Sequence, residues 1–385
     1  MKNIFAFLIP MLIIASCTDP FDDSKIWDKL NEHENKINDI ENGGDGNTNN
    51  GTDISGEIAT NKIYYTTSDG KKLFPSNTEP ATFGAILVSN IYENGTGVLT
   101  FDDDITSVGG FNGCTQLTSI TIPNNVTSIG NSAFDGCSSL TSVTIGNGVT
   151  SIGSSAFEDC SGLTSITIPN NVTRIGNYAF EGCNSLKDLR IEDGEGILSL
   201  GYNYSSGGYV GMFYDCPLET LYIGRDLSYD TSYSSSFYNK STLTSVTIGN
   251  SVTRIDNSAF KGCLSLTSIT IASTNAMYDS RENCNAIIET STNTLLVGCK
   301  SSTIPNSVTS IASSAFYGCT GLTSVTIPNS VTSIGGSAFH NCSGLKEVHI
   351  TDLDAWKNIS FGNYSANPLK NGAKLYLNGV EVTNY

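Results

Sequence analysis

The sequence contains a repeat of fixed length. Residues 117–139, LTSITIPNNVTSIGNSAFDGCSS, are followed directly by two phrases of equal length and nearly identical composition. The same 23-residue step separates Cys114, Cys137, Cys160 and Cys183. A period of this size indicates an array of stacked units in which each unit contacts only its neighbours. We therefore expect one solenoid, rather than the two or three independent domains that 385 residues would otherwise allow.

Each unit carries the apolar positions of one coil. The opening Leu-x-x-Ile-x-Ile alternates apolar and polar side chains, which predicts a short strand, and Pro123-Asn124 predicts a turn. A second extended piece follows at Val126 and Ile129, and a short helical or irregular turn closes the unit over 132–137. One unit cannot bury these side chains alone, so stacked neighbours must form the core. The positions that we assign to this core are Leu117, Ile120, Ile122, Val126, Ile129, Phe134, Cys137, Phe157, Cys160, Phe180, Cys183, Phe316, Cys319, Phe339 and Cys342.

The repeated phrase resembles the unit of the BspA-type leucine-rich repeats of bacterial surface proteins, over about residues 105–346. The resemblance implies a leucine-rich-repeat solenoid, built mainly from short parallel strands with short helical or irregular turns. It also implies export to the cell surface and adhesive binding to host proteins or other cells. It supplies no catalytic residue. We assign the repeats to residues 105–353.

Two regions that do not follow the phrase flank the array. Residues 57–104 alternate apolar and polar side chains between turn signals such as Asn94-Gly95. A repeat array exposes its last coil unless something covers it, so we predict a small β cap here; a separate ligand-binding β domain is the alternative. Residues 354–385 drift from the phrase and predict a degenerate terminal coil or cap, with Trp356 buried.

The first residues indicate export with a lipid anchor. A lysine and an apolar run too short to span a bilayer precede Cys17. The pattern resembles the bacterial lipobox, in which the cysteine becomes the acylated first residue. We therefore predict a lipoprotein signal peptide over 1–16 and an acylated acidic tether over 17–23. This interpretation predicts an outer membrane lipoprotein, exposed on the cell surface, that contacts the membrane only through its lipid anchor. An ordinary secretory signal is the alternative.

A stalk and a linker are expected between the anchor and the cap. Residues 24–41 space their apolar side chains by four and three, which is the seam of a short coiled coil: Ile26, Leu30, His33, Ile37 and Ile40. Such a helical stalk is one route to an oligomer. Residues 42–56, with GGDGNTNNG at their centre, predict a flexible linker.

Departures from the phrase indicate where the surface is not repetitive. Eight of the 17 tyrosines lie between residues 201 and 238, among serine and glycine. This composition is typical of adaptable recognition loops. We interpret Tyr222, in the strand phrase LETLYIG, as filling space in a longer coil. Our binding hypothesis uses four tyrosines that are flanked by polar residues and that we expect to be exposed: Tyr202, Tyr204, Tyr229 and Tyr233.

A second departure spans residues 272–302. Apolar runs at 286–288 and 295–297 flank Ser291-Thr292-Asn293, which predicts a hairpin inserted into a coil. Three oxygen-bearing side chains in this segment lack the spacing of a calcium loop, so we expect a solvated turn rather than a metal site: Asp279, Glu282 and Asn283.

Cysteine usage requires an interpretation of its own. The chain has 11 cysteines, and setting Cys17 aside leaves an even number, which in an exported protein suggests disulfides. The equal spacing favours buried free thiols stacked at one repeat position. Cys284 and Cys299 are the pair most open to bridging. The cysteines do not form C-x-x-C pairs, and histidines are too few for a zinc site, so we expect no metal and no other cofactor.

Charge and motif content narrow the function. The formal net charge of −17 disfavours nucleic-acid binding. Only three histidines are present, and neither a nucleophile elbow nor paired carboxylates stand out, so we do not expect an enzyme. We expect a non-catalytic binding and adhesion module for an extracellular protein, either from the host matrix or from another bacterial surface. The alternatives are a glycan-binding accessory lipoprotein, which stacks sugars on tyrosines, and a scaffold for envelope proteins.

Overall fold

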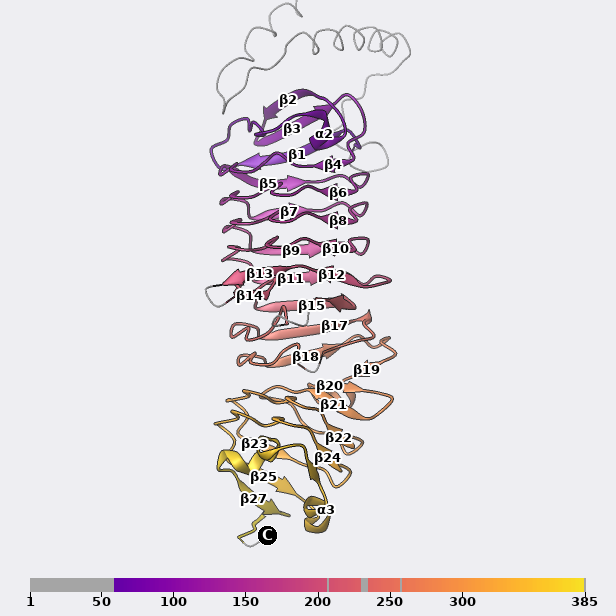
Figure 1. The fold of residues 1–385 in the computed structure, drawn as a ribbon, viewed down its shortest axis with the longest axis vertical. Coiled ribbons are helices and arrows are strands. Elements are labelled where there is room, and N and C mark those ends of the chain that lie inside the picture. Colours follow the sequence, from indigo (N-terminus) through magenta and orange to yellow (C-terminus); the bar gives the residue numbers. More distant parts are fainter. Residues whose placement is uncertain (1–58, 206–207, 230–234, 257, 384–385) are drawn as a thin grey trace, which may run out of the picture. The chain divides into compact units, whose positions relative to one another are not determined.

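The computed structural model divides the chain into two units, Met1–Glu57 and Ile58–Tyr385. It describes residues 59–383, except 206–207, 230–234 and 257. The expected signal peptide, tether, stalk and linker all lie outside the described residues. The second unit is therefore described by itself (Figure 1).

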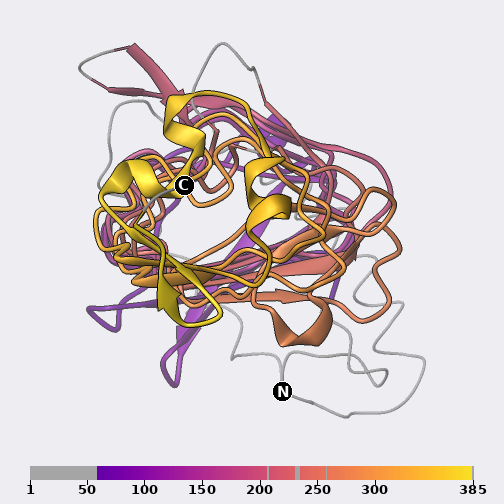
Figure 2. The same ribbon diagram turned by 90° about the horizontal axis from the view of Figure 1, so that it is seen from below.

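The second unit is a parallel β-solenoid, which confirms the fold expected from the repeat. Each regular coil contributes one longer strand and one two-residue strand, as in β5 (Leu117–Thr121) and β6 (Ser128–Ile129). The next coil contributes β7 (Ser142–Thr144) and β8 (Ser151–Ile152), and both pairs are parallel, with Ser119 opposite Ser142. The coils stack around a common interior when viewed along the array (Figure 2).

Two families of strands run along the array (Figure 1). The longer strands after β7 are β9 (Ser165–Ile168), β11 (Asp188–Ile191), β15 (Thr220–Arg225), β17 (Ser245–Ser251) and β18 (Ser268–Ile271), which pair in that order. The shorter strands are β4 (Ser107–Val108), β6, β8, β10 (Arg174–Ile175), β12 (Leu198–Leu200) and β16 (Leu227–Ser228), which form one six-stranded sheet.

The interior contains a stack of phenylalanine rings. Phe134, Phe157 and Phe180 are fully buried, and consecutive ring centroids lie 5.3 and 5.5 Å apart in nearly parallel planes. Each neighbouring thiol donates to a phenylalanine carbonyl one coil away; for example, Cys160 Sγ lies 3.1 Å from the oxygen of Phe134. All fifteen positions assigned to the repeat core are buried. The closing part of the unit, 132–137, consists of hydrogen-bonded turns rather than a helix.

An antiparallel sheet covers the first coil. Strand β1 (Lys62–Thr67) pairs with β3 (Thr96–Phe101) on one side and with β5 on the other, antiparallel in both cases, and β2 (Leu87–Glu93) forms the outer edge. The short helix α2 (Pro80–Phe83) buries Phe83 against Phe101 and Phe111, with ring centroids 4.8 and 6.1 Å away. Phe83 thereby extends the aromatic stack into the cap.

The segment 272–302 interrupts the array. Here β19 (Tyr278–Asp279) pairs antiparallel with β20 (Ile287–Glu289), and β20 pairs antiparallel with β21 (Thr294–Val297). Strand β21 also pairs parallel with β22 (Ser310–Ile311), which rejoins the array. The 3-10 turn at Arg281–Asn283 carries an ion pair in which Arg281 Nη2 lies 2.8 Å from Asp279 Oδ2. No cluster of three potential metal ligands occurs among the described residues.

Stacked coils resume after this insertion, and the last of them is irregular. The longer strands are β23 (Ser324–Thr326), β25 (Glu347–Ile350) and β27 (Lys374–Leu377), and the shorter ones are β24 (Ser333–Ile334) and β26 (Ser360–Phe361). Helix α3 (Leu353–Lys357) buries Trp356 against Phe361, and β28 (Val380–Glu381) folds back antiparallel on β27. Within the described ranges, no helix has the length and apolar character needed to cross a membrane.

Candidate binding surface on the strand face

The outward face of the longer strands is almost uniform. Side chains alternate between core and solvent along a strand, and most coils present serine and threonine outward, as at Ser165 and Thr167 of β9. Two neighbouring strands differ. Their outward residues are Asp188 and Arg190 on β11, and Thr220 and Tyr222 on β15.

These four side chains form a connected surface patch, which we call the Arg-Tyr patch. Arg190 lies opposite Tyr222 in the parallel register, and its guanidinium carbon is 3.8 Å from the centre of the tyrosine ring. Such cation–π contacts hold both groups in a fixed orientation. The hydroxyl of Tyr222 donates to the carboxylate of Asp193, and the hydroxyl of Thr220 donates to that of Asp188. Partial burial, followed by the interaction with Asp193, raises the pKa of Tyr222, which favours the protonated phenol that donates to Asp193.

A shallow groove of about 280 Å³ crosses β9, β11, β15 and β17 at this patch. Serine and threonine residues of the neighbouring coils line it, and the Arg-Tyr patch supplies its charged and aromatic groups. The sequence-based interpretation of Tyr222 as space-filling was wrong. It lies between the core positions Leu221 and Ile223 of the Leu-x-x-Ile-x-Ile register, and the alternation of a strand therefore places it on the outward side.

A comparable change occurs on the last two longer strands. The outward residues are Glu347 and His349 on β25, and Lys374 and Tyr376 on β27. The His349 ring stacks on Tyr376 with centroids 5.2 Å apart, and its Nε2 lies 3.1 Å from Glu347 Oε2. Aromatic and charged groups thus appear at two places on otherwise hydroxyl-bearing strand faces.

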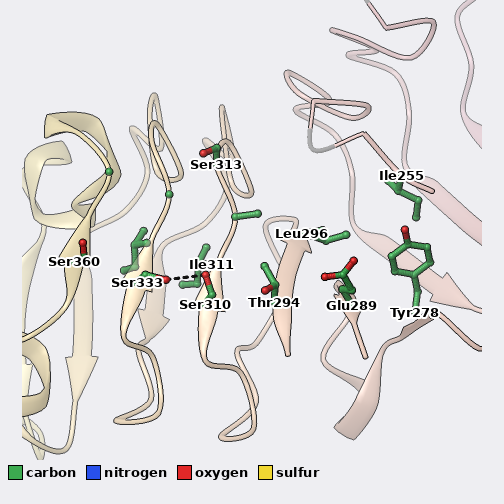
Figure 3. A pocket seen from close by; sticks show the side chains of 14 residues that line it. Ile255, Tyr278, Glu289, Thr294, Leu296, Ser310, Ile311, Ser313, Ser333 and Ser360 are labelled. Atoms are coloured by element: carbon green, nitrogen blue, oxygen red, sulfur yellow. Dashed lines mark hydrogen bonds between the residues drawn. The ribbon is translucent and has the colours of Figure 1, made fainter. Parts of the chain in front are cut away.

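A further groove of about 520 Å³ runs from the insertion along the shorter strands that follow it (Figure 3). Hydroxyl groups of β21, β22 and β24 line it, and the Ser310 and Ser333 oxygens lie 2.8 Å apart. Tyr278 and Glu289 stand at one end of this groove. The hydroxyl lining can offer hydrogen bonds but carries no charge.

The predicted tyrosine cluster is only partly formed on the described surface. Tyr202 and Tyr204 lie on β13 (Tyr202–Ser205), which forms a hairpin with β14 (Gly208–Gly211). The Tyr204 side chain is 53% exposed, whereas Tyr202 is half-buried and packs edge-on against Tyr178 with centroids 5.5 Å apart. The hairpin projects beyond the outline of the other coils (Figure 2).

Tyr229 differs from the expectation of exposure. It is half-buried against the core, and its hydroxyl donates to Asp256 Oδ2 at 3.2 Å. Burial raises its pKa. A residue that directly follows a shorter strand stays close to the stack, which local polarity could not reveal. Tyr233 lies outside the described residues.

The ten described cysteines are free and buried. Burial raises the pKa of Cys160, Cys263 and Cys342, each to about 12. Cys284 and Cys299, the pair most open to bridging, contact different groups: the first lies 3.6 Å from Ser280 Oγ and the second 3.4 Å from Asn285 Nδ2.

Two buried cations were missed by sequence reasoning. Lys240 occupies the cysteine position of its coil, and its ammonium donates to the carbonyl oxygens of Phe213, Tyr214 and Cys216. Arg225, which is 1% exposed, donates to the carbonyl oxygens of residues 169 and 170. Burial lowers the pKa of both groups. Aligning FYNKS with FDGCS would have identified Lys240, because the repeat register assigns that position to the interior.

Comparison with known proteins agrees with the geometry. Residues 105–207, 209–288 and 292–371 match the model of the BspA type leucine rich repeat region, in six copies. No curated protein shows a significant match.

Several solved structures are similar. A leucine rich cell surface protein from Faecalibacterium prausnitzii is 24% identical over 67% of this chain and 93% of its own, with a TM-score of 0.27. A leucine-rich repeat protein from Bacteroides ovatus is 22% identical over 71% of this chain and 89% of its own, with a TM-score of 0.30. The pneumococcal vaccine antigen PcpA is 17% identical over 76% of this chain and 69% of its own, with a TM-score of 0.37. Because the family model matches well over half of the residues, the chain belongs to the family of BspA-type leucine-rich repeat proteins.

Proposed function

We propose that this protein is a non-catalytic binding module for an extracellular protein, and that the Arg-Tyr patch is the centre of its contact surface. The observation that carries the proposal is the stacked pair of Arg190 and Tyr222, beside neighbouring strands β9 and β17 that present serine and threonine outward. Arginine and tyrosine are over-represented among the residues that dominate binding energy at protein interfaces. Their mutual stacking fixes both side chains before binding, which lowers the entropic cost of association.

The surroundings of the patch favour a protein ligand with a neutral or basic surface. The chain carries 37 acidic and 20 basic side chains, so long-range attraction favours partners without strong negative charge. Family membership supports display at the bacterial surface. We propose that acylation at Cys17 holds the protein there as an outer membrane lipoprotein, with the partner supplied by the host matrix or by another bacterial surface.

The test compares binding of the full-length chain and of the double variant Arg190→Ala/Tyr222→Ala to parallel arrays of matrix proteins and purified glycans. Loss of an interfacial anchor typically costs at least 1–2 kcal/mol, so we expect protein binding to weaken by about tenfold or more. The control is Thr121→Ala/Thr144→Ala, on the same face of β5 and β7. Equal protein binding by both double variants and the parent would contradict the proposal.

A glycan-binding function is the second candidate, and the exposed Tyr204 on the β13–β14 hairpin favours it. A flat aromatic ring at a protruding edge can stack on a sugar face. The single variant Tyr204→Ala distinguishes the two candidates on the same arrays. Glycan binding that is lost in Tyr204→Ala and retained in Arg190→Ala/Tyr222→Ala would establish capture of polysaccharide; absence of any glycan signal would eliminate it.

A further inference from the structure

The strand β18 ends its sheet at a groove. Among the described residues, its only paired neighbour is β17. Strands β7 and β9 also end separate sheets, but their coils are joined by the parallel pairing of β8 with β10. Beyond β18 the insertion begins, and a groove of about 550 Å³ lies between the strand and the loop that follows it. This volume is within the usual range for ligand sites, about 300–1,000 Å³.

Along β18, the backbone N–H and C=O groups of every second residue face this groove. Ser268 and Ala272 donate their N–H groups to carbonyl oxygens of the β17 chain. Successive residues of a strand point their N–H and C=O groups toward opposite edges. Ile269 and Ile271 therefore turn their backbone groups away from β17 and toward the groove.

The side chain of Asn285 already occupies one position on this edge. The N–H of Ile269 donates to Asn285 Oδ1 at 2.5 Å, and Asn285 Nδ2 donates to the carbonyl oxygen of Thr267 at 2.6 Å. A paired parallel strand would form the same two bonds around Ser268 with its own peptide groups. The amide of Asn285 thus shows which chemistry this edge accepts.

The next position along the edge has the same arrangement. At the first position, the carbonyl of Thr267 and the N–H of Ile269 lie on either side of Ser268 and face the groove. At the second position, the carbonyl of Ile269 and the N–H of Ile271 lie in the same way on either side of Thr270. In the described part of the chain, no strand pairs with this second position. We propose that the groove binds an extended peptide segment of a protein ligand, which adds to β18 as a further strand and continues the edge beyond Asn285.

The opposite wall of the groove is fixed before binding. Tyr278 is 3% exposed, and its hydroxyl donates to the carbonyl oxygen of Thr253 at 3.1 Å. Arg281 is held by Asp279 and, through Nη1, by Asn293 Oδ1 at 2.8 Å. These opposite charges neutralise each other, so the groove selects for main-chain groups rather than for a charged side chain.

The loop also stores backbone strain. Glu282, Asn283 and Asn285 have φ angles of 58°, 52° and 55°, in the left-handed region that side chains disfavour. Such a conformation persists where the surroundings enforce it, and asparagine adopts it more readily than most residues. Here it directs the loop around the groove and places the amide of Asn285 on the β18 edge.

The experiment uses the full-length chain and a fluorescent peptide with the sequence LTSITI of residues 163–168 and a lysine at each end for solubility. Fluorescence polarisation should show saturable binding of the peptide with a dissociation constant below 1 mM. Ile271→Pro removes the N–H that faces the groove, and proline is tolerated on edge strands at such positions. Because the lost bond leaves a buried acceptor unmatched, we expect binding about tenfold weaker. The matched control, Ile271→Val, keeps the N–H and should bind like the parent.

A change to the ligand gives a second test that cannot alter the fold of the protein. The same peptide, N-methylated at alternate amides, has the same charge but cannot complete a strand ladder, so its binding should also be about tenfold weaker or lost. Equal binding of the methylated and unmethylated peptides, or no saturable binding at 1 mM, would overturn the proposal. The double variant Arg190→Ala/Tyr222→Ala should bind the peptide normally, which separates this groove from the strand-face function.

Discussion

Single positions in this protein are governed by what the repeat places above and below them. The cysteine position is the clearest case, because a thiol there is buried and donates to a phenylalanine carbonyl one coil away, as Cys342 does to Phe316 at 3.0 Å. A small, weakly polar group fits this position, since a thiol loses little by leaving water. Lys240 is the exception, and it fits only because three carbonyl oxygens receive its ammonium.

The thiols make folding stability sensitive to alkaline pH. Burial raises the pKa of Cys160 and Cys342 to about 12, whereas thiols of the unfolded chain ionise near pH 8.5. A raised pKa in the folded state means that the stabilising contribution is complete below the unfolded pKa and is lost as pH rises toward the folded value. Each such thiol should lower the free energy of unfolding by about 1.4 kcal/mol per pH unit above pH 9.

Urea unfolding between pH 7.5 and 10.5, with reductant present, measures this slope. Cys160→Ala/Cys342→Ala should begin less stable at pH 7.5, because it removes packed atoms, but should lose stability less steeply above pH 9. Ser161→Ala/Ser343→Ala, at neighbouring positions of the same coils, is the control for the slope. Identical slopes in parent and cysteine variant would show that these thiols do not govern the alkaline loss.

At the scale of elements, the strands and core of the regular coils could be predicted from the sequence, whereas those of the irregular coils and the insertion could be predicted only in part. The alternation in LTSITI and the recurring phenylalanine and cysteine define strand, core and period. Polarity of neighbours did not locate Tyr229, because its burial depends on the coil that carries Asp256 rather than on its own segment. The Arg190–Tyr222 contact joins residues from different coils, so it requires the register of the stack, which the repeat supplies once the irregular coils are aligned.

The insertion also interrupts the aromatic stack. Gly298 occupies the position that phenylalanine has in the regular coils. Its N–H donates to the carbonyl of Ala315, and Cys319 Sγ lies 3.9 Å from its carbonyl oxygen, as in the bonds made by the phenylalanine backbone elsewhere. The ring of Phe316 lies directly over it, so that a Cβ added at Gly298 would come within 2.2 Å of a ring carbon. Glycine is thus required here by close packing, not by a positive φ.

Gly298→Ala should therefore destabilise the chain by about 1–3 kcal/mol, the usual cost of overpacking a closely packed interior. Chemical denaturation of the full-length variant measures the change. Gly130→Ala provides the control, since the nearest atom to an added Cβ there is 3.4 Å away. Equal stability of the two variants would mean that Phe316 can move aside without loss.

For the solenoid as a whole, the interruption divides the buried core into two clusters. One extends from Ile63 to Ala312 and the other from Cys284 to Leu375, and they interleave between Cys284 and Ala312, in the insertion and the coil that follows it. Stability of a repeat array is approximately a sum of coil energies and neighbour interfaces. Where an interface lacks the longer-strand pairing and the ring contact, coupling between the two sides should be weaker than between regular coils.

We therefore expect the two sides to unfold as separate units. Phe157→Ala and Phe339→Ala remove equivalent rings from the first and second clusters, each at a cost of about 3–5 kcal/mol. Native-state hydrogen exchange reports the local opening energy of each amide. Phe339→Ala should lower protection in β22 to β27 and leave β5 to β11 nearly unchanged, and Phe157→Ala should do the reverse. If either variant lowered protection equally on both sides, the array would be one cooperative unit, and the insertion would have to transmit stability as well as the regular coils do.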